Sequence, residues 1–327
     1  MVPKWLRILG RGCRNYYTAH PLCVSIEVTH SCTADCRHCD KGGRIEEKRV
    51  NVEVYVERLR ELMNPPTLQI SGGEPFLRDD VDDIIRTIKS TVRTPLIIFV
   101  TNGSLLSESR YAKLKDVGTD KISISLDFPD NRHDSFRKSP GLFKHLSEVI
   151  PSLAVKYGSN GIAVNTAITK ENFPYLCDIV LKAEEWGIGV SFSAYTALRT
   201  GDKSLMLSYD DTKELEIVIN SLLQMKSKGL KILNTPRILR GIVQYFRDGC
   251  MPNCSAGKRF VVIRPNGTLV PCSSISHKPS SSFKELKEYV SKNKCNECYV
   301  AIRAYSDRKI SDFAYEIVPM IRLLSKV

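Results

Sequence analysis

The chain has 327 residues, a length that fits one large domain or a domain with an appendage. Its composition, 42% hydrophobic and 26% charged, is ordinary for a soluble globular protein, and no apolar run approaches the roughly 20 residues of a membrane-spanning helix. The formal net charge of +12 fits an acidic partner such as nucleic acid, an anionic lipid surface or a phosphorylated small molecule, and equally a solvated basic surface.

The first residues, MVPKWLRILGRGCRNYY, form a basic and amphipathic segment. This segment lacks the apolar region and the small-residue cleavage site of a signal peptide, so we expect a cytoplasmic protein. Structural disulfides are rare in that compartment. The eleven cysteines therefore point to metal binding or catalysis.

Short β-rich runs alternate with helical stretches along the first two thirds of the chain. Six β runs separated by helices indicate βαβ units on a parallel sheet, an α/β fold. Both faces of such a sheet are covered, which explains the near-continuous apolar character of the runs. The predicted strands are 24–28, 67–70, 95–100, 121–126, 161–168 and 189–194, and the predicted helices include 54–63, 81–90, 142–156 and 172–186.

The pattern changes after about residue 205. Helical stretches at 209–228 and 235–247 lead to a cysteine-rich region. A β-hairpin is predicted there, because two β-rich runs flank Asn266-Gly267, a strong turn signal. A helix near 283–292 and a last helical stretch with Pro319 follow. The predicted division is an N-terminal segment, a parallel α/β domain, a helical connection and a cysteine-rich domain, at 1–22, 23–205, 206–248 and 249–327.

Three cysteines, Cys32, Cys36 and Cys39, lie just after the first predicted strand. In parallel α/β folds the chemistry gathers at the C-terminal ends of the strands, so these thiols stand where a cofactor would be held. Three thiolates on one short loop do not complete a tetrahedral zinc site. They match three irons of a [4Fe–4S] cube and leave the fourth iron open, and an open position is typical of catalytic use.

The spacing CxxxCxxC directly after the first strand resembles that of the radical S-adenosylmethionine (SAM) superfamily. Further motifs follow in this family's order, from about residue 22 to residue 200. The resemblance implies a partial (β/α)6 TIM-like barrel that binds SAM along strands two to five. The implied SAM contacts are Ser71, Gly72, Gly73, Glu74, Pro75, Asn102, Ser123, Ser125, Asp127, Arg137 and Asn165.

The family also implies roles for these motifs. The Gly-Gly-Glu motif binds the amino group of SAM, and its glycines allow the backbone to approach a ligand closely, which a Cβ would block. One position departs from the family, because the residue before the third cysteine is usually aromatic and here is His38. This planar ring is expected to replace the aromatic residue beside the adenine, with a charged or metal-binding role as the alternative.

The same resemblance implies the reaction. One electron from the reduced cluster would cleave SAM to a 5′-deoxyadenosyl radical, which abstracts hydrogen from an unactivated C–H bond. An electron donor such as ferredoxin or flavodoxin would reduce the cluster. The cofactors carry the difficult step, whereas the protein positions the substrate and excludes water.

A second group of cysteines lies in the C-terminal region. The sequence from Gly267 to Cys272 resembles the opening of a twitch or SPASM domain, an appendage of radical SAM enzymes. No cysteine follows Cys298, which favours a twitch-like domain with one auxiliary [4Fe–4S] cluster over a full SPASM domain. A structural zinc site is the alternative that the spacing permits, and Cys250 is a spare thiol or an alternative to Cys254. The expected ligands are Cys254, Cys272, Cys295 and Cys298.

Several substrate classes stay open. Our leading hypothesis is a membrane lipid or isoprenoid chain, because basic amphipathic segments at 4–14 and 313–326 predict contact with an anionic membrane surface. The opposing interpretation is that both segments pack onto the barrel as ordinary helices. The alternatives are a maturase of a ribosomal peptide or protein and an enzyme of cofactor biosynthesis. RNA modification is disfavoured because the sequence contains no RNA-binding motif.

Three further side chains are candidates for substrate chemistry. Tyr195 follows the sixth strand and is a candidate hydrogen donor or relay, with a packed aromatic ring as the alternative. Arg199 and Lys203, in the next loop, are candidate contacts for an anionic group, with solvated loop charges as the alternative. A non-enzymatic zinc protein is the remaining hypothesis, and it leaves the Gly72-Gly73-Glu74 motif and the first cysteines without a shared purpose.

Overall fold

The computed structural model of the protein describes residues 3–274 and 279–307. The last predicted helical stretch, with Pro319 and the amphipathic residues 313–326, lies outside the described residues. No helix in the described part of the chain is both long enough and apolar enough to cross a lipid bilayer.

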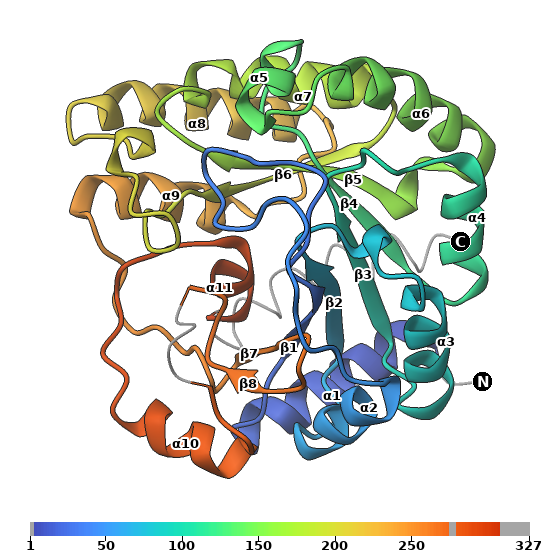
Figure 1. The fold of residues 1–327 in the computed structure, drawn as a ribbon. Coiled ribbons are helices and arrows are strands. Elements are labelled where there is room, and N and C mark those ends of the chain that lie inside the picture. Colours follow the sequence, from blue (N-terminus) through green and yellow to red (C-terminus); the bar gives the residue numbers. More distant parts are fainter. Residues whose placement is uncertain (1–2, 275–278, 308–327) are drawn as a thin grey trace.

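One curved eight-stranded sheet forms the centre of the protein (Figure 1). Its strand order is β6-β5-β4-β3-β2-β1-β7-β8, and all neighbouring strands are parallel except the β7–β8 hairpin. The order of β1 to β6 confirms the predicted partial (β/α)6 TIM-like barrel. The strands are β1 Cys23–Thr29, β2 Thr67–Gly72, β3 Leu96–Thr101, β4 Lys121–Ser125, β5 Ile162–Ile168, β6 Gly189–Ala194, β7 Phe260–Ile263 and β8 Leu269–Val270.

Helices cover the outer face of this sheet (Figure 1). The predicted helices are all present within the described residues, whereas α4, α5 and α11 were not predicted. α4 buries only Tyr111 and Leu114, so its apolar pattern is weak, and α5 and α11 have six residues each. The helices are α1 Lys4–Tyr17, α2 Val52–Glu61, α3 Val81–Thr91, α4 Glu108–Asp116, α5 Arg132–Arg137, α6 Leu142–Tyr157, α7 Leu176–Glu185, α8 Asp211–Ser227, α9 Pro236–Asp248, α10 Phe283–Ser291 and α11 Ala301–Ser306.

The two faces of the sheet differ in polarity. On β1, Val24, Ile26 and Val28 are fully buried in the core that the sheet shares with helices such as α2. Successive side chains of a strand point to opposite faces, so the residues between them face the inside of the barrel. This inner face is polar and partly accessible, which corrects the expectation of strands that are apolar on both faces. Its half-buried polar residues include Gln69, Ser71, Ser123, Ser125, Asn165 and Ser191.

Helix α1 lies at the end of the barrel where the strands begin. Lys4 Nζ donates to Asp120 Oδ1 at 2.6 Å, just before β4, and Arg11 Nη2 donates to the Val92 carbonyl at 3.0 Å, before β3. The side-chain amide of Asn15 is buried and donates to the Pro21 carbonyl at 2.7 Å. Lys4 and Arg11 thus contact the barrel, which favours the interpretation that this segment packs onto it as an ordinary helix.

The predicted β-hairpin is present, but it extends the sheet of the barrel itself. β7 pairs in parallel with β1 from Cys23↔Phe260 to Ile26↔Ile263. Gly267 adopts φ +78° in the connecting turn, a conformation that glycine adopts without strain. The cysteine-rich region and the barrel are thus joined by the backbone hydrogen bonds between β7 and β1. The domain limits given above stay a prediction.

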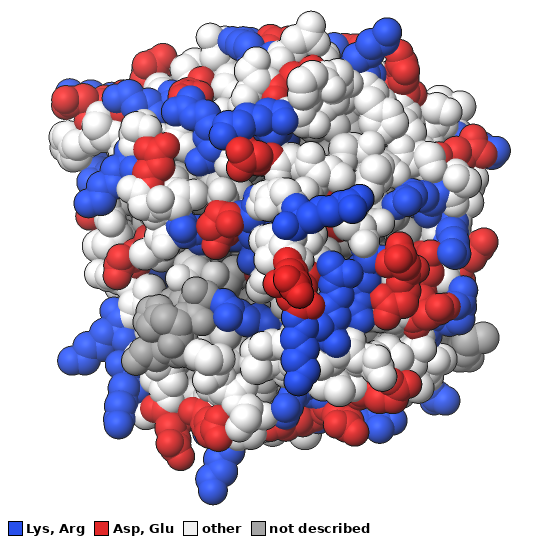
Figure 2. All heavy atoms as spheres, viewed as in Figure 1, with Lys and Arg blue, Asp and Glu red and all other residues white. Residues whose placement is uncertain are grey.

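Charges of both signs are interspersed on the face seen in Figure 2. Several exposed basic side chains of the protein form ion pairs with acidic neighbours. Lys138 Nζ lies 2.9 Å from Asp35 Oδ2, and Arg247 Nη2 lies 2.8 Å from Glu216 Oε2. On this face, the basic side chains are therefore interspersed with acidic ones and do not form one basic groove.

Candidate active site

The loop with the first three cysteines is held by the Gly-Gly-Glu motif after β2. The Gly73 N–H donates to the Thr29 carbonyl at 2.8 Å, and the Glu74 N–H donates to the Ser31 carbonyl at 2.8 Å. A Cβ on Gly73 would lie 2.1 Å from the Ser31 oxygen, and one on Gly72 would lie 2.1 Å from the Thr29 oxygen. The close approach of the cysteine loop therefore requires both glycines, and their contact with SAM stays a prediction.

The Glu74 side chain is fully buried and joins the ends of two strands. Its carboxyl group accepts hydrogen bonds from the Thr101 hydroxyl at 2.8 Å, the Asn102 N–H at 2.9 Å and the Phe76 N–H at 3.1 Å. Burial raises the pKa of Glu74 to about 7, although these donors act against the rise. All of these partners belong to the protein, so the carboxyl group fixes the β3 end against the β2 end, and its contact with SAM stays a prediction.

Cys32, Cys36 and Cys39 lie within electrostatic reach of one another. Burial raises the pKa of Cys36 to about 11, and the other two thiols add to the rise. Two donors point at the sulfurs: Asn102 Nδ2 lies 3.5 Å from Cys32 Sγ, and Arg137 Nη1 lies 3.9 Å from Cys36 Sγ. Three thiols with N–H groups directed at two of them are a donor set that fits an iron–sulfur cluster.

A single metal ion is a different case. Among the residues that the structure describes, no three histidine, cysteine or acidic side chains are arranged around a common point as ligands of one ion. A [4Fe–4S] cube takes each thiolate at a different iron, so its ligands lie farther apart.

Arg137 and Asp127 form a buried ion pair next to the first cysteines. Arg137 Nε and Nη2 each lie 2.7 Å from Asp127 Oδ2, and Asp127 is fully buried. Burial would raise the pKa of Asp127, but Arg137 and the imidazoles of His38 and His133 hold it below its usual range. Arg137 was predicted to contact SAM. In the structure its partners are Asp127 and the Cys36 sulfur. Arg137 can approach both because α5 is the next helix after β4.

His38 provides the flat ring expected before the third cysteine. Its ring stacks on Phe136, with centroids 4.9 Å apart and planes at 14°. Burial lowers the pKa of His38 to about 4, so the ring is neutral near pH 7 and the alternative of a charged role is not supported. Its Nδ1 atom is buried and has no hydrogen-bond partner among the described residues.

The remaining predicted SAM contacts lie at or near the inner face of the barrel. Asn102 Nδ2 donates to Thr33 Oγ1 at 2.9 Å, beside Cys32. Asn165 Oδ1 accepts a hydrogen bond from the Ser191 hydroxyl at 3.0 Å. Ser71 shares a hydrogen bond with Ser25 at 2.7 Å. Pairing in register places Ser125, Asn165 and Ser191 side by side on three adjacent strands.

Tyr195 does not have the position proposed for a hydrogen donor. Its ring is buried in a cluster with Phe128, Phe136 and Leu205. Its phenol hydroxyl is hydrogen-bonded to Thr200 Oγ1 at 2.7 Å and to the Asp202 carbonyl at 2.9 Å. The alternative of a packed aromatic ring is the one observed, because the 200–202 loop folds back onto the hydroxyl.

Arg199 approaches the first cysteine loop. Its guanidinium pairs with Asp40, and its Nε atom is buried without a hydrogen-bond partner among the described residues. Burial acts to lower the pKa of Arg199, but Cys39, Asp40 and Glu27 together raise it. This loop arginine therefore contributes positive charge next to Cys39.

The second group of cysteines is also brought together. The Cys254 thiol donates a hydrogen bond to Cys295, which lowers the pKa of Cys295 to about 6 and raises that of Cys254. The charge of Cys298 adds to the rise in the pKa of Cys254, and the charge of Cys295 adds to the rise in the pKa of Cys298, which is mainly due to burial. Burial raises the pKa of the Tyr289 phenol, and the nearby charges of Cys295, Cys272 and Cys254 raise it further. Cys254, rather than Cys250, is the thiol that is hydrogen-bonded to Cys295.

Residues 26–174 match the family model described as the radical SAM superfamily. Residues 26–174 are therefore a radical SAM domain. A curated relative is the AdoMet-dependent heme synthase of Oleidesulfovibrio alaskensis, which is 26% identical over 77% of this chain and 70% of the relative. Another is the mycofactocin maturase MftC of Mycobacterium tuberculosis, with 22% identity over 91% of this chain and 79% of the relative.

Solved structures share the fold of this radical SAM enzyme. Streptococcus suis SuiB bound to the precursor peptide SuiA has a TM-score of 0.66 at 16% identity, over 86% of this chain and 67% of that one. Native anSMEcpe with bound AdoMet has a TM-score of 0.65 at 17% identity, over 94% of this chain and 100% of that one. These structures confirm the predicted fold, and the family model supports the predicted superfamily.

Two buried charged residues of this radical SAM enzyme were missed by the sequence analysis. Glu27 lies inside the apolar run VSIEV, and a charged residue within a strand of this kind is a signal of a specific partner. Arg303 is fully buried in α11, close to Cys298. Its only sequence signal is its place five residues after that cysteine.

Proposed function

We propose that this radical SAM enzyme binds SAM at the C-terminal ends of its barrel strands and carries two [4Fe–4S] clusters. Cys32, Cys36 and Cys39 would hold the first cluster. The observation that supports this most is the arrangement of seven thiols as two separate groups, each with a buried arginine at one sulfur. The proposed ligands of the auxiliary cluster are Cys254, Cys272, Cys295 and Cys298.

Bound together, the first cluster and SAM would supply a 5′-deoxyadenosyl radical that abstracts hydrogen from a substrate C–H bond. The protein's own groups serve to bind and orient. The neutral His38 ring and Phe136 offer a flat surface for the adenine. Asn102 and the half-buried serines of β2 and β4 offer hydrogen bonds, and their small size leaves room inside the barrel.

For the substrate, we propose a peptide or protein side chain, with a cofactor precursor as the second candidate. Relatives named PqqA peptide cyclase and mycofactocin maturase, and the fold shared with SuiB, support the first. Relatives named AdoMet-dependent heme synthase support the second. A lipid or isoprenoid chain stays a prediction with less support, because the inner face is polar and the basic residues of α1 contact the barrel.

The cluster assignment is tested with anaerobically reconstituted protein. We expect about eight irons and equal sulfide per chain, and about four after Cys32, Cys36 and Cys39 are replaced by alanine. Dithionite should convert SAM to 5′-deoxyadenosine only with the unaltered first group. A variant with alanine at all four auxiliary cysteines should keep about four irons. The matched control, Cys13→Ala with Cys177→Ala, should keep all the iron. Zinc in place of iron at the second group of cysteines would contradict the auxiliary cluster and make that region a structural domain.

The substrate class is tested by deuterium transfer. A deuterium-labelled cell extract is separated into peptide, small-molecule and lipid fractions, and each is incubated with enzyme, SAM and dithionite. Deuterium in 5′-deoxyadenosine from the peptide fraction would support the first candidate. Transfer from the small-molecule fraction would support a cofactor precursor, and transfer from the lipid fraction would contradict both.

A further inference from the structure

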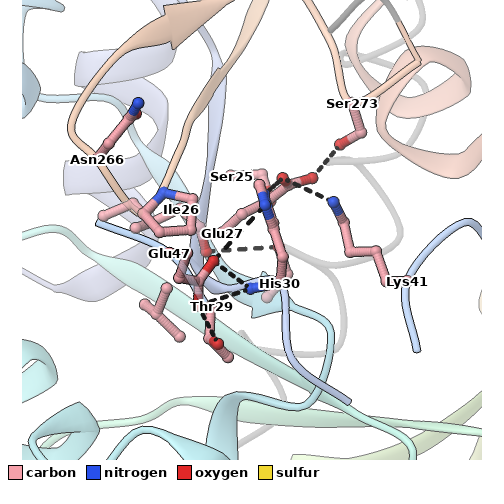
Figure 3. A network of polar contacts seen from close by, with 12 residues as sticks. Ser25, Ile26, Glu27, Thr29, His30, Lys41, Glu47, Asn266 and Ser273 are labelled. Atoms are coloured by element: carbon pink, nitrogen blue, oxygen red, sulfur yellow. Dashed lines mark hydrogen bonds and ion pairs between the residues drawn. The ribbon is translucent and has the colours of Figure 1, made fainter. Parts of the chain in front are cut away.

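Glu27 is a buried carboxylate on β1 that none of the motifs above uses. Its side chain is 4% exposed, although it lies in a strand whose neighbours Ile26 and Val28 pack into the outer core. Alternation along the strand directs Glu27 to the inner face of the barrel. Figure 3 shows its carboxylate at the centre of a network of polar contacts.

Three side chains from different segments converge on this carboxylate (Figure 3). His30 Nε2 donates to Oε2 at 2.8 Å, the Ser273 hydroxyl donates to Oε1 at 2.7 Å, and Lys41 Nζ lies 3.4 Å from Oε2. Burial would raise the pKa of Glu27, but these partners and Arg199 lower it to about 2. The group is therefore a fixed negative charge.

The partners connect the two groups of cysteines. His30 and Lys41 stand on either side of the segment that carries Cys32, Cys36 and Cys39. Ser273 directly follows Cys272 of the second group. A single carboxylate thus holds the loop of one group and a residue adjacent to the other.

The backbone does not make this connection by itself. The ladder between β1 and β7 ends at Ile26↔Ile263, and Ser273 lies beyond the end of β8 at Val270. Cys272 itself packs against a small cluster that includes Cys23, at the start of β1. The Ser273 hydroxyl adds a second connection, nearer the end of β1, through a hydrogen bond to a charged acceptor, a strong class of hydrogen bond.

A second, half-buried carboxylate nearby offers a contrast. Glu47 accepts hydrogen bonds from the Thr29 hydroxyl at 2.5 Å, the His30 N–H at 2.9 Å and Arg49 Nε at 3.0 Å. One donor is the last residue of β1, and the other two lie between β1 and α2. Glu47 thus supports the first loop alone, which makes it a matched control for Glu27.

We propose that Glu27 is a positioning residue that sets the separation of the two iron–sulfur sites by fastening Ser273 to the strand that leads into the first cysteine loop. This rests on the proposed function for the clusters themselves. Its fixed charge also acts on electron transfer, because a negative group near a cluster disfavours the addition of an electron.

The test compares Glu27→Ala, Glu27→Gln, Ser273→Ala and Glu47→Gln in the full chain. The first measurement is the rate at which iodoacetamide labels Cys272 in the iron-free protein, followed by mass spectrometry. Glu27→Ala and Ser273→Ala should each raise this rate about tenfold, which corresponds to ~1.4 kcal/mol. The double variant should add nothing further, because both changes remove the same bond. Glu47→Gln should leave the rate unchanged.

The second measurement separates position from charge in the reconstituted protein. Glu27→Gln keeps an acceptor for Ser273, so labelling of Cys272 should stay near that of the unaltered protein while both reduction potentials move to more positive values. Glu27→Ala should also weaken the magnetic interaction between the reduced clusters. Unchanged Cys272 labelling in both alanine variants would overturn the proposal.

The two proposals fail in different ways. An unaltered chain that takes up no iron contradicts the proposed function, and the labelling experiment on the iron-free chain still decides the role of Glu27. If Glu27→Ala fails to fold, Ser273→Ala decides the question, because it leaves the carboxylate paired with His30 and Lys41.

Discussion

Arg303 contacts Cys298 twice: its Nη1 atom donates to the Cys298 carbonyl at 2.5 Å and lies 3.9 Å from the Cys298 sulfur. Nη2 of the same guanidinium donates to the Pro252 carbonyl at 2.9 Å, and Nε pairs with Asp307 at 3.1 Å. Arg303 is fully buried and forms an internal link between the segment before Cys254 and the segment of Cys298, which a backbone hydrogen bond from Met251 to Asn296 also joins. Its charge also offsets the charge of nearby thiolates.

Replacing Arg303 with methionine should disrupt the second cysteine group. The change keeps most of the volume but leaves buried carbonyl groups without their donor and Asp307 without its ion-pair partner, so we expect a loss of about 3–5 kcal/mol of unfolding free energy. Reconstituted protein should hold about four irons in place of about eight. Urea unfolding and iron analysis measure both effects. Arg132→Met, at an exposed ion pair with Asp130, should change stability by less than ~1 kcal/mol.

The carboxyl group of Glu74 should make stability depend on pH near neutrality. Its pKa is raised from 4.5 to about 7, so the folded protein holds this proton over a range in which the unfolded chain has released it. The stabilisation is complete below pH 4.5 and is lost as pH rises through about 7, and at ~1.4 kcal/mol per unit it is on the order of 3 kcal/mol. Urea unfolding between these pH values should show this fall in the unaltered protein, and Glu74→Gln should flatten it. Glu46→Gln, at an exposed position, should retain it.

Gly73→Ala should displace the loop of the first cysteines. The new Cβ would lie 2.1 Å from the Ser31 oxygen, which is backbone, so the loop itself must move. We expect a loss of about 1–3 kcal/mol of stability, typical of overpacking, and loss of the iron of the first cluster with the second retained. Gly10→Ala is the matched control, because α1 leaves open space there and alanine favours a helix by about 0.5–1 kcal/mol. Full iron in Gly73→Ala would contradict the role given to this glycine.

Tyr195→Phe should leave the radical step intact. Removing the hydroxyl takes away its hydrogen bonds to Thr200 and Asp202, which lowers stability by about 1 kcal/mol. The rate of 5′-deoxyadenosine formation should match that of the unaltered enzyme. A loss of product without a loss of stability would return Tyr195 to the list of catalytic candidates.

The barrel could be predicted because the sequence patterns that specify its strands and helices are local. Each β run is apolar and bounded by polar helical segments, and Asn266-Gly267 marks a hairpin by turn chemistry alone. The pairing of β7 with β1 could not be predicted, because a parallel ladder between segments at opposite ends of the chain has no local pattern. The hairpin was accordingly expected in a separate domain.

The thiol groups of the candidate site could be predicted from cysteine spacing, but the partners of its charged residues could not. Glu74 and Arg137 were predicted to meet SAM, and the structure pairs them with Thr101, Asn102 and Asp127. Such pairs depend on how strand ends meet in space. Glu27 is different, because a carboxylate inside an apolar strand was visible in the sequence and indicates a buried partner.

The parallel pairing of β1 with β7 has a consequence for the order in which the protein folds. β1 is synthesised early, and the strand that covers its free edge is synthesised only after α9. Until Phe260 to Ile263 emerge, that edge presents unpaired backbone groups on an apolar strand, the kind of surface through which chains aggregate. Shortened forms that end before Phe260 should therefore self-associate, whatever the state of their cysteines.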